Sequence, residues 1–300
     1  MDSTAVTALL DDVSNWGRWG EDDRAGTLNL IGAPQRAAAL SMATGGQLVS
    51  LARPVGPRRA SDYGSEFVHF MTSSGLELPA EGAATVGDWM AMGLHGRVNT
   101  HLDAHSHIFW NGRTYNDLPA ADVSASRGAG KGGLEPWFDG AITRGVLIDI
   151  PRARGAAVAP GEGVTAAELS ACLTAQGVRL EPGDALAVRT GYDQAYASGA
   201  ATAGAPGLDI SCVRWLRGKD VAVLLSDATH DVAPPQYESC EYPIHTACIV
   251  AMGMWLVDNA DLARLSEVCE QRGQYAFCLV LVPTKLKHAT GAPVNPIAVF

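Results

Sequence analysis

The sequence predicts one α/β domain that spans residues 1–300. Its second half alternates apolar segments of strand length with helical segments, which is typical of α/β proteins. Its first half is rich in loops and short strands, and no repeat or linker divides the chain, whose length suits one large domain. A hydrophobic content of 47% with 33 glycines favours a globular, loop-rich enzyme over a fibrous or disordered chain.

Charge and composition exclude several classes of protein. The net charge of −10 argues against nucleic acids and anionic membranes as partners. No run of about 18 apolar residues predicts a membrane span, and the N-terminus shows no secretory signal. The six cysteines form no CxxC pair and lie mostly among apolar residues, which indicates reduced, buried thiols. We therefore expect a cytoplasmic protein that acts on a small molecule.

The first half begins with residues 1–35, in which we expect the stretch from Trp16 through the following charged residues to Gly26 and Thr27 to form an ordered loop. Trp16 and Trp19 in this loop are expected to pack onto the core, with covering a pocket as the alternative. A helix is predicted over residues 35–44, and a strand over residues 47–52.

Residues 53–90 are rich in Pro, Gly, Ser and acidic groups, so we expect loops with short strands. His69 lies in an alternating segment and is expected in the core or at a pocket edge. The glycine-rich loop in residues 119–140 is not a phosphate-binding P-loop, because Gly132 rather than Ser or Thr follows Lys131.

The second half supplies most of the predicted regular structure. A capping box of Thr165 and Glu168 predicts the start of a helix. The segment 275–283 is the most hydrophobic and is expected to be the central strand, and the proline-containing tail is expected to be packed. The predicted strands are 145–150, 185–189, 221–225 and 275–283, and the predicted helices are 164–177, 209–217, 262–269 and one from His245 through Leu256.

The segment from His95 to His107, HGRVNTHLDAHSH, is the strongest functional signal. It holds four of the eight histidines of the chain. If it is extended, one face carries His101, Asp103, His105 and His107, because alternate side chains of a strand share a face. Imidazoles and a carboxylate on one face are ligands for Zn, Mn or Fe, or proton carriers. A solvated polar strand is the alternative, and the density of the cluster favours a functional site.

Other segments are candidates for a pocket. Trp110 and Tyr115 closely follow the histidine segment and are expected to wall a substrate pocket. The segments 190–193 and 226–231 each follow a predicted buried strand, where ligand-contacting loops often lie. For Asp227 in the second segment, a turn cap is an equally good interpretation.

These residues together resemble the cyclase superfamily, which includes bacterial kynurenine formamidase, isatin hydrolase and polyketide ring cyclases. Its hallmark HxGTHxDxPxH aligns with residues 97–107, and the resemblance extends over most of the chain to the C-terminal GAPVNPIAVF. The matching residues are Thr100, His101, Asp103 and His107. The resemblance implies a mixed β-sheet or barrel-like core flanked by helices, the swivelling β/β/α fold, and a homodimer or homotetramer.

The resemblance also implies roles for individual residues. His101 and Asp103 correspond to metal ligands, and His107 to the catalytic acid/base. His245 matches a histidine of the formamidase metal site, and we place it among the catalytic residues. Asp258 falls beside the place of a glutamate ligand.

The sequence departs from the hallmark at three positions. Arg97 replaces the first histidine, and a guanidinium does not ligate a cation at ordinary pH. Asn99 replaces the glycine and His105 the proline, and both are expected to contact substrate. His95 can serve as the missing ligand only if the strand shifts or bulges.

The first functional hypothesis is a metal-dependent hydrolase. Zn²⁺ or Mn²⁺ held by His101, Asp103 and a further ligand would lower the pKa of bound water towards about 7. The resulting hydroxide attacks a cyclic amide, formamide or lactone, and His107 carries the proton. Arg97 stabilises the oxyanion or holds a substrate carboxylate.

Two other hypotheses stay open. The second is a cyclase or dehydratase that needs no metal and acts on a natural-product intermediate. In it His107 abstracts a proton while Arg97, Asn99 and His101 polarise a carbonyl. The third is a binding protein that has kept the fold without the activity.

Overall fold

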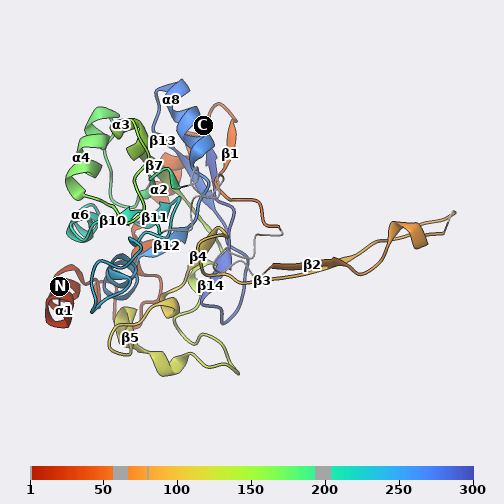
Figure 1. The fold of residues 1–300 in the computed structure, drawn as a ribbon, viewed down its shortest axis with the longest axis horizontal. Helices are drawn as coiled ribbons and strands as arrows, with labels where there is room; N and C mark the ends of the chain where they lie inside the picture. The colour runs from red at the N-terminus through yellow and green to blue at the C-terminus, as the bar shows by residue number, and fades with distance from the viewer. Residues whose placement is uncertain (1, 57–66, 80, 193–203) are drawn as a thin grey trace.

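A computed structural model describes residues 2–56, 67–79, 81–192 and 204–300. It is a mixed nine-stranded sheet, a half-barrel flanked by helices, so the predicted α/β fold is confirmed (Figure 1). From one edge to the other, the strands are β1 (Leu48–Ser50), β15 (Ile297–Val299), β13 (Ala276–Leu281), β7 (Ala141–Asp149), β9 (Ala185–Arg189), β11 (Val223–Ser226), β12 (Trp255–Asp258), β4 (His101–Asp103) and β14 (Gly291–Pro293).

The middle of the sheet is parallel. Strands β7, β9, β11 and β12 pair in parallel, whereas β4 pairs antiparallel with both β12 and β14. Most side chains of the parallel strands are apolar and buried on both faces, because each face is covered.

Helices cover both faces of the sheet. The helices are α1 (Ser3–Val13), α2 (Ala33–Leu40), α3 (Ile150–Arg154), α4 (Ala166–Ala175), α6 (Cys212–Gly218), α7 (Pro243–His245), which continues as a π-helix over Thr246–Ala251, and α8 (Ala263–Arg272). Apolar side chains of α1, α4, α6 and the π-helix pack with Leu186 and Leu256 on one face. Those of α8 pack with Ala187 and Val257 on the other face. The alternation along β9 and β12 therefore assigns neighbouring residues to opposite cores.

Several predicted elements are confirmed. The strand over 185–189 coincides with β9. The capping box forms at α4, where the Glu168 N–H donates to Thr165 Oγ1 at 3.3 Å and Thr165 N–H donates to Glu168 Oε2 at 2.9 Å. The tail is packed, since it supplies β14 and β15. All six cysteines are free and buried.

Two predictions about the second half are wrong. The helix that begins near His245 ends at Ala251, and Leu256 lies in β12 rather than on that helix. Gly253 separates the two elements with a φ of +60°, a conformation that suits glycine because it has no Cβ. Strand β13 is not central, because β9 occupies the middle of the sheet and β13 lies third from one edge.

A two-stranded arm projects from the body between β1 and β4 (Figure 1). It consists of β2 (Phe67–Met71), the 3₁₀ turn Gly75–Glu77 and β3 (Asp88–Met92), and we call residues 67–79 and 81–92 the arm. The side chain of His69 is 40% exposed there and pairs with Asp88, with 2.8 Å between Nε2 and Oδ2. The expectation of a core or pocket-edge histidine is therefore wrong.

The N-terminal loop packs only partly onto the core. Trp16 remains 39% exposed, while its indole N–H donates to the carbonyl of Val250 at 2.6 Å. The guanidinium of Arg18 lies 4.7 Å from the ring centre of Trp19.

Two further small pairs of strands are β5 (Arg113–Thr114) with β6 (Leu118–Pro119), and β8 (Gly163–Val164) with β10 (Gly207–Leu208). None of the helices in the described ranges has the length and apolar character needed to cross a bilayer.

Candidate metal centre

Strand β4 places His101 and Asp103 on one face and Leu102 on the other. Leu102 is fully buried in the core shared with α8, so the opposite face of β4 carries the two polar side chains. On the neighbouring strand β12, Asp258 pairs in register with His101. The sheet thus joins groups that lie far apart in the sequence.

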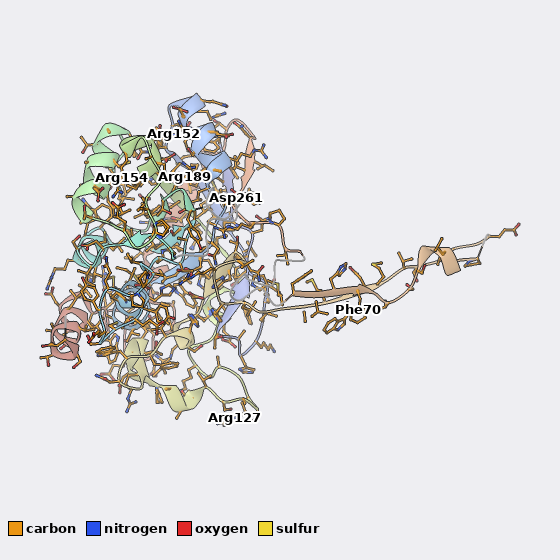
Figure 2. All side chains as sticks on the ribbon, in the orientation of Figure 1. Phe70, Arg127, Arg152, Arg154, Arg189 and Asp261 are labelled. Atoms are coloured by element: carbon orange, nitrogen blue, oxygen red, sulfur yellow. The ribbon has the colours of Figure 1, made fainter. Side chains whose placement is uncertain are left out.

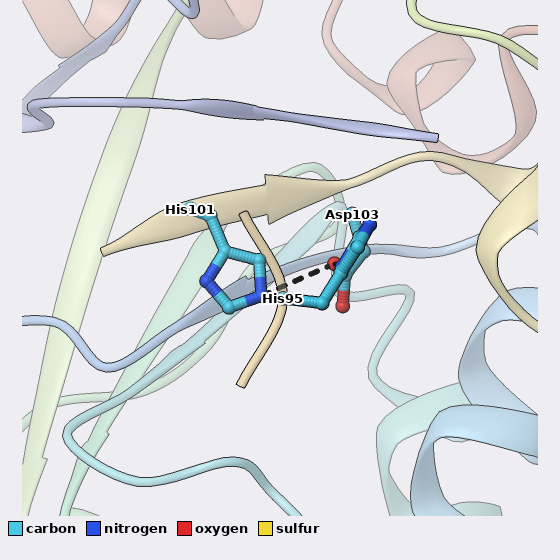
Figure 3. Close-up of side chains that lie close together, drawn as sticks. All are labelled: His95, His101 and Asp103. Atoms are coloured by element: carbon cyan, nitrogen blue, oxygen red, sulfur yellow. Dashed lines mark ion pairs between the residues drawn. The ribbon is translucent and has the colours of Figure 1, made fainter. Parts of the chain in front are cut away.

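His95 reaches the same place because residues 95–99 leave the strand path and bend. Its Nδ1 lies 2.9 Å from Asp103 Oδ1, and His101 Nε2 lies 3.4 Å from the same oxygen (Figure 3). Its Nε2 lies 3.0 Å from the hydroxyl of Thr290. The chain therefore departs from a regular strand here, as His95 requires in order to reach the other ligands.

The other side of Asp103 faces a second group. Its Oδ2 lies 3.4 Å from His245 Nε2, which is also 3.5 Å from Asp258 Oδ2. His245 Nδ1 donates to Asp231 Oδ2 at 2.5 Å, so its Nε2 is directed at the two other carboxylates. His230 Nε2 lies 3.1 Å from Asp258 Oδ1.

These side chains form two groups of three donors that share Asp103. One is His95, His101 and Asp103, and the other is Asp103, His245 and Asp258; within each, the donor atoms lie within 4.8 Å of one another. Imidazole nitrogens and carboxylate oxygens are the donors that Zn²⁺ and Mn²⁺ accept in proteins.

The hydrogen bonding of this centre fits a cation. Both carboxylate oxygens of Asp103, both ring nitrogens of His230 and Asp258 Oδ1 are buried without a hydrogen-bond partner. The short contacts among them lack hydrogen-bond geometry, although Asp103 and His230 have no exposed surface. Buried polar atoms without a partner cost about 1–3 kcal/mol each, and more when charged. A cation among them would remove this cost, so the residues present fit a divalent metal.

His101 is oriented by the backbone that precedes it. Its Nδ1–H donates to the carbonyl of Asn99 at 2.8 Å, which fixes the tautomer and leaves Nε2 as a lone-pair donor. The side-chain amide nitrogen of Asn99 donates to the carbonyl of Gly93 at 3.0 Å, so this group is not available to the centre. Asn259 supports the same turn, because its amide donates to the carbonyls of Gly96 and Asn99.

The carboxylates and the imidazoles shift one another's ionisation. Burial alone would raise the pKa of Asp103, but the surrounding imidazoles, led by His107 and His101, hold it well below its usual range. Burial alone would lower the pKa of His245, but the carboxylates of Asp258, Asp103 and Asp231 raise it well above its ordinary value. The centre is therefore anionic enough to attract a positive charge, either a proton or a metal ion.

His107 lies beside His95 at the edge of the two donor groups. It is partly exposed, and its ring stacks on that of His95 with 3.7 Å between the ring centres and an angle of 3°. Burial lowers the pKa of His107 to about 4 in spite of the attraction of Asp103. Its imidazole is therefore neutral at pH 7.

His105 does not share this face, and the prediction of one continuous strand through His107 is wrong. Strand β4 ends at Asp103, and residues 105–107 form a 3₁₀ turn that directs His105 to the opposite side. There its Nε2–H donates to the carbonyl of Gly253 at 3.0 Å. Its ring packs against that of Trp255, with 4.2 Å between the ring centres. Burial lowers its pKa to about 4.

The predicted pocket residues lie apart from the ligands. Tyr115 is fully buried, and its hydroxyl donates to Asp23 Oδ2 at 3.0 Å. Trp110 is half-buried, and its indole N–H donates to the hydroxyl of Thr7 at 3.2 Å. Both therefore connect the segment after the centre to the N-terminal part of the chain.

Arg97 is half-buried in the bend between His95 and His101. Its backbone carbonyl accepts a hydrogen bond from Arg53 at 3.2 Å. Across the described residues, no hydrogen bond or ion pair joins the Arg97 guanidinium to Asp103 or Asp258. At the position of the family's first histidine, this chain therefore has a residue that does not pair with these carboxylates, whose charged neighbours are imidazoles.

Two residues of the centre were not predicted individually. His230 and Asp231 lie in the polar segment after β11, which the sequence indicates as a candidate site without roles for these two residues. Asp231 holds His245 and caps the start of α7, because its Oδ1 accepts the Ile244 N–H at 2.6 Å. The sequence signal for both is their place directly after the apolar segment 221–225, where ligand-contacting loops often lie.

Asp227 in that segment is a structural cap. Its carboxylate accepts the backbone N–H groups of Thr190, Gly191 and Tyr192 at 2.8–3.1 Å. The interpretation as a turn-stabilising residue therefore accounts for these contacts.

Comparison with known proteins supports the fold and the family. The Cyclase family model, described as "Putative cyclase", matches residues 49–230. A crystal structure described as a novel cyclase aligns with a TM-score of 0.87 and 28% identity, covering 96% of this chain and 100% of the other. No curated protein matches the sequence significantly.

Two more distant structures share the fold. Isatin hydrolase A from Labrenzia aggregata aligns with a TM-score of 0.60 and 17% identity, covering 84% of this chain and 93% of its own. A predicted metal-dependent hydrolase from Bacillus stearothermophilus aligns with a TM-score of 0.52 and 13% identity, covering 84% and 97%. With a family model that matches more than half of its length and a sheet that presents a buried His/Asp centre, the chain belongs to the cyclase family.

Proposed function

We propose that this protein is a metal-dependent hydrolase that cleaves the C–N or C–O bond of a cyclic amide, a formamide or a lactone. The observation that carries the proposal is the set of buried, unpartnered donor atoms around Asp103. Isatin hydrolases and a metal-dependent hydrolase are among the proteins of similar fold, which supports the same class of reaction.

Two subsites follow from the donor groups. His95, His101 and Asp103 would hold one ion, and Asp103, His245 and Asp258 the adjacent position, with Asp103 able to serve both. A Zn²⁺ or Mn²⁺ ion bound there supplies Lewis-acid activation of water and of the substrate carbonyl. Asn99 and Asp231 act through His101 and His245 by fixing which ring nitrogen faces the centre.

His107 is the proposed proton carrier. It belongs to neither donor group, and its partly exposed ring stacks on that of His95. From this place its imidazole takes a proton from the attacking water and delivers it to the leaving nitrogen or oxygen. Arg97, in the bend two residues after His95, is proposed to hold a substrate carboxylate or a developing oxyanion.

The test separates metal binding from turnover. The protein is purified without added metal, its metal content is measured by elemental analysis, and hydrolysis is assayed on a panel of cyclic amides, formamides and lactones. We expect stoichiometric metal in the wild type. Asp103→Asn should lose both metal and activity. His107→Ala should keep the metal and lose about 10²–10⁴-fold in turnover, the usual contribution of a general acid/base.

The control is His288→Asn, which changes an exposed histidine whose positive φ asparagine tolerates. It should retain metal and activity. Wild-type protein without stoichiometric metal, whose activity survives chelators, would refute the metal-dependent mechanism.

That outcome would favour the second candidate, a cyclase or dehydratase that needs no metal. The supporting observation is that carboxylates of Asp231, Asp103 and Asp258 lie 2.5, 3.4 and 3.5 Å from one imidazole, that of His245. A proton on that ring can balance their charge in place of an ion. His107 would then be the base that removes a proton from the substrate.

A further inference from the structure

Asp258 directs only one of its two carboxylate oxygens at the donor groups. Its Oδ2 lies 3.5 Å from His245 Nε2, whereas its Oδ1 is buried and has no hydrogen-bond partner among the described residues. Asp103 differs, because each of its oxygens faces an imidazole of a donor group. Asp258 Oδ1 therefore needs a partner from outside the donor groups.

His230 faces that oxygen. Its Nε2 lies 3.1 Å from Asp258 Oδ1, a length that suits a hydrogen bond although the angles do not. The imidazole has no exposed surface, and neither of its ring nitrogens has a hydrogen-bond partner in the described ranges. Buried polar groups are costly when they stay unpaired. One hydrogen bond from Nε2–H to Oδ1 would satisfy an atom on each residue.

No arginine competes for this carboxylate in the part of the chain that the structure describes. The buried Arg189 pairs with Asp149, with 3.2 Å between Nη1 and Oδ1, and Arg152 contacts the same carboxylate. Figure 2 shows the two labelled arginines in the same region of the body. The ion pairs that Asp258 makes with described residues are instead with the imidazoles of His230 and His245.

The backbone fixes His230 in this position. Its φ of +54° is left-handed, a conformation that few residues other than glycine adopt and that histidine tolerates better than most. Its carbonyl accepts the N–H of Leu208 at 2.7 Å, and a Cβ on Gly207 would lie 2.5 Å from that carbonyl oxygen. Close packing against β10 therefore holds this conformation and keeps the ring beside Asp258.

The other imidazoles of the centre show the same kind of support. Each uses one ring nitrogen for the donor groups, and its second nitrogen contacts a group outside them. These pairs are His95 with the Thr290 hydroxyl at 3.0 Å, His101 with the Asn99 carbonyl at 2.8 Å, and His245 with the Asp231 carboxylate at 2.5 Å. Supporting contacts of this kind orient metal ligands.

We propose that His230 is the positioning residue of Asp258, because its Nε2–H donates to Oδ1 and so directs Oδ2 at the metal. This inference rests on the proposed function, since it takes a divalent ion at this centre as given. His230 belongs to neither donor group, so it acts on the ion through Asp258. A carboxylate that is already oriented loses less freedom when it binds the ion.

The test is a calorimetric titration of Zn²⁺ into metal-free, full-length protein. We expect two binding steps in the wild type. His230→Asn removes the donor at Nε2, so it should weaken one step by about 10- to 100-fold, the usual effect of losing a supporting group, and leave the other step unchanged. His230→Gln can place its amide nitrogen near the position of Nε2, so it should restore most of the lost affinity.

The order of the two variants separates positioning from packing. Asparagine tolerates a left-handed backbone better than glutamine does, so a purely structural role of His230 predicts the tighter binding for His230→Asn. The matched control is His288→Asn, which makes the same replacement at an exposed histidine with a φ of +59°. It should retain both steps.

Three results would overturn the inference. They are wild-type affinity in His230→Asn, an equal loss at both steps in that variant, and binding by His230→Gln that is no tighter than that of His230→Asn. In each of them the wild type still binds metal, so the hydrolase proposal stands. A wild type that binds no Zn²⁺ would refute the metal-dependent mechanism and this inference together.

Discussion

At the scale of single residues, His95 joins the candidate metal centre from outside strand β4, which carries His101 and Asp103. His95 lies beside Asp103 although Arg97, two residues later, occupies the position of the family's first histidine. We expect His95→Ala to lower the affinity for Zn²⁺ by about 10- to 100-fold, comparable to losing a supporting group at a metal site. Arg97→Ala should leave the affinity unchanged within error. Titration calorimetry of the two variants measures both.

Equal losses in the two variants would contradict this assignment, and so would a larger loss for Arg97→Ala. The variant Arg97→His adds a further check. Because His95 already faces Asp103, a new histidine at 97 should not raise the metal stoichiometry measured by elemental analysis.

The sequence predicted the local part of this centre well. His101 and Asp103 are two residues apart, so strand periodicity alone places them together. His95 required a bend that periodicity does not encode, and His105 was misplaced because the strand ends at Asp103. His230 joins the centre through the pairing of β11 with β12, and such long-range pairing leaves little local trace in the sequence.

At the scale of elements, the turn after the π-helix decides where β12 begins. Gly253 has a φ of +60°, and a Cβ there would lie 2.6 Å from ring carbons of Tyr115. We expect Gly253→Ala to lower the free energy of unfolding by about 3 kcal/mol, from left-handed strain together with overpacking. The midpoint of urea unfolding measures the loss.

Gly177 provides a matched control for the strain alone. Its φ of +64° is nearly the same, and an added Cβ would meet nothing within 4 Å. Gly177→Ala should therefore cost only about 1–2 kcal/mol. If both variants lost the same stability, the contact with Tyr115 would be too soft to matter.

The same turn explains the main error in predicting elements. Ile249, Met252 and Leu256 follow helical spacing, and the sequence around them is apolar, so periodicity favoured one long helix. The glycine at 253 divides that pattern into a π-helix and a buried strand. Short apolar segments fit either a strand or a helix, and here the pairing of β12 with β11 and β4 decides.

At the scale of the whole molecule, a metal that binds only the folded centre stabilises the fold. With metal at 100 times its dissociation constant, the gain is about 2.7 kcal/mol, which corresponds to a rise in Tm of roughly 4–5 °C for a chain of this size. Differential scanning calorimetry of chelator-treated protein, before and after addition of Mn²⁺ or Zn²⁺, tests this. Asp103→Asn should show no rise, and a rise of equal size in that variant would place the ion elsewhere.

The overall architecture was predictable as a class but not in its outline. Alternating strands and helices in the second half indicated the α/β fold. The order of the strands was not available from local patterns, because β1 and β15 or β4 and β14 pair across most of the chain. The arm was expected as loops and short strands, and its projection from the body depends on packing that periodicity does not record.

The position of β4 between β12 and β14 also has a consequence during synthesis. The β4 ligands leave the ribosome early, but roughly 190 residues separate Asp103 from Gly291, its partner on β14. At about 5–20 residues per second, that interval is about 10–40 s. Until then β4 lacks one of its two partner strands, because β12 emerges earlier and can pair with only one of its edges. The strand that carries His101 and Asp103 is therefore held on both edges only once nearly the whole chain has emerged.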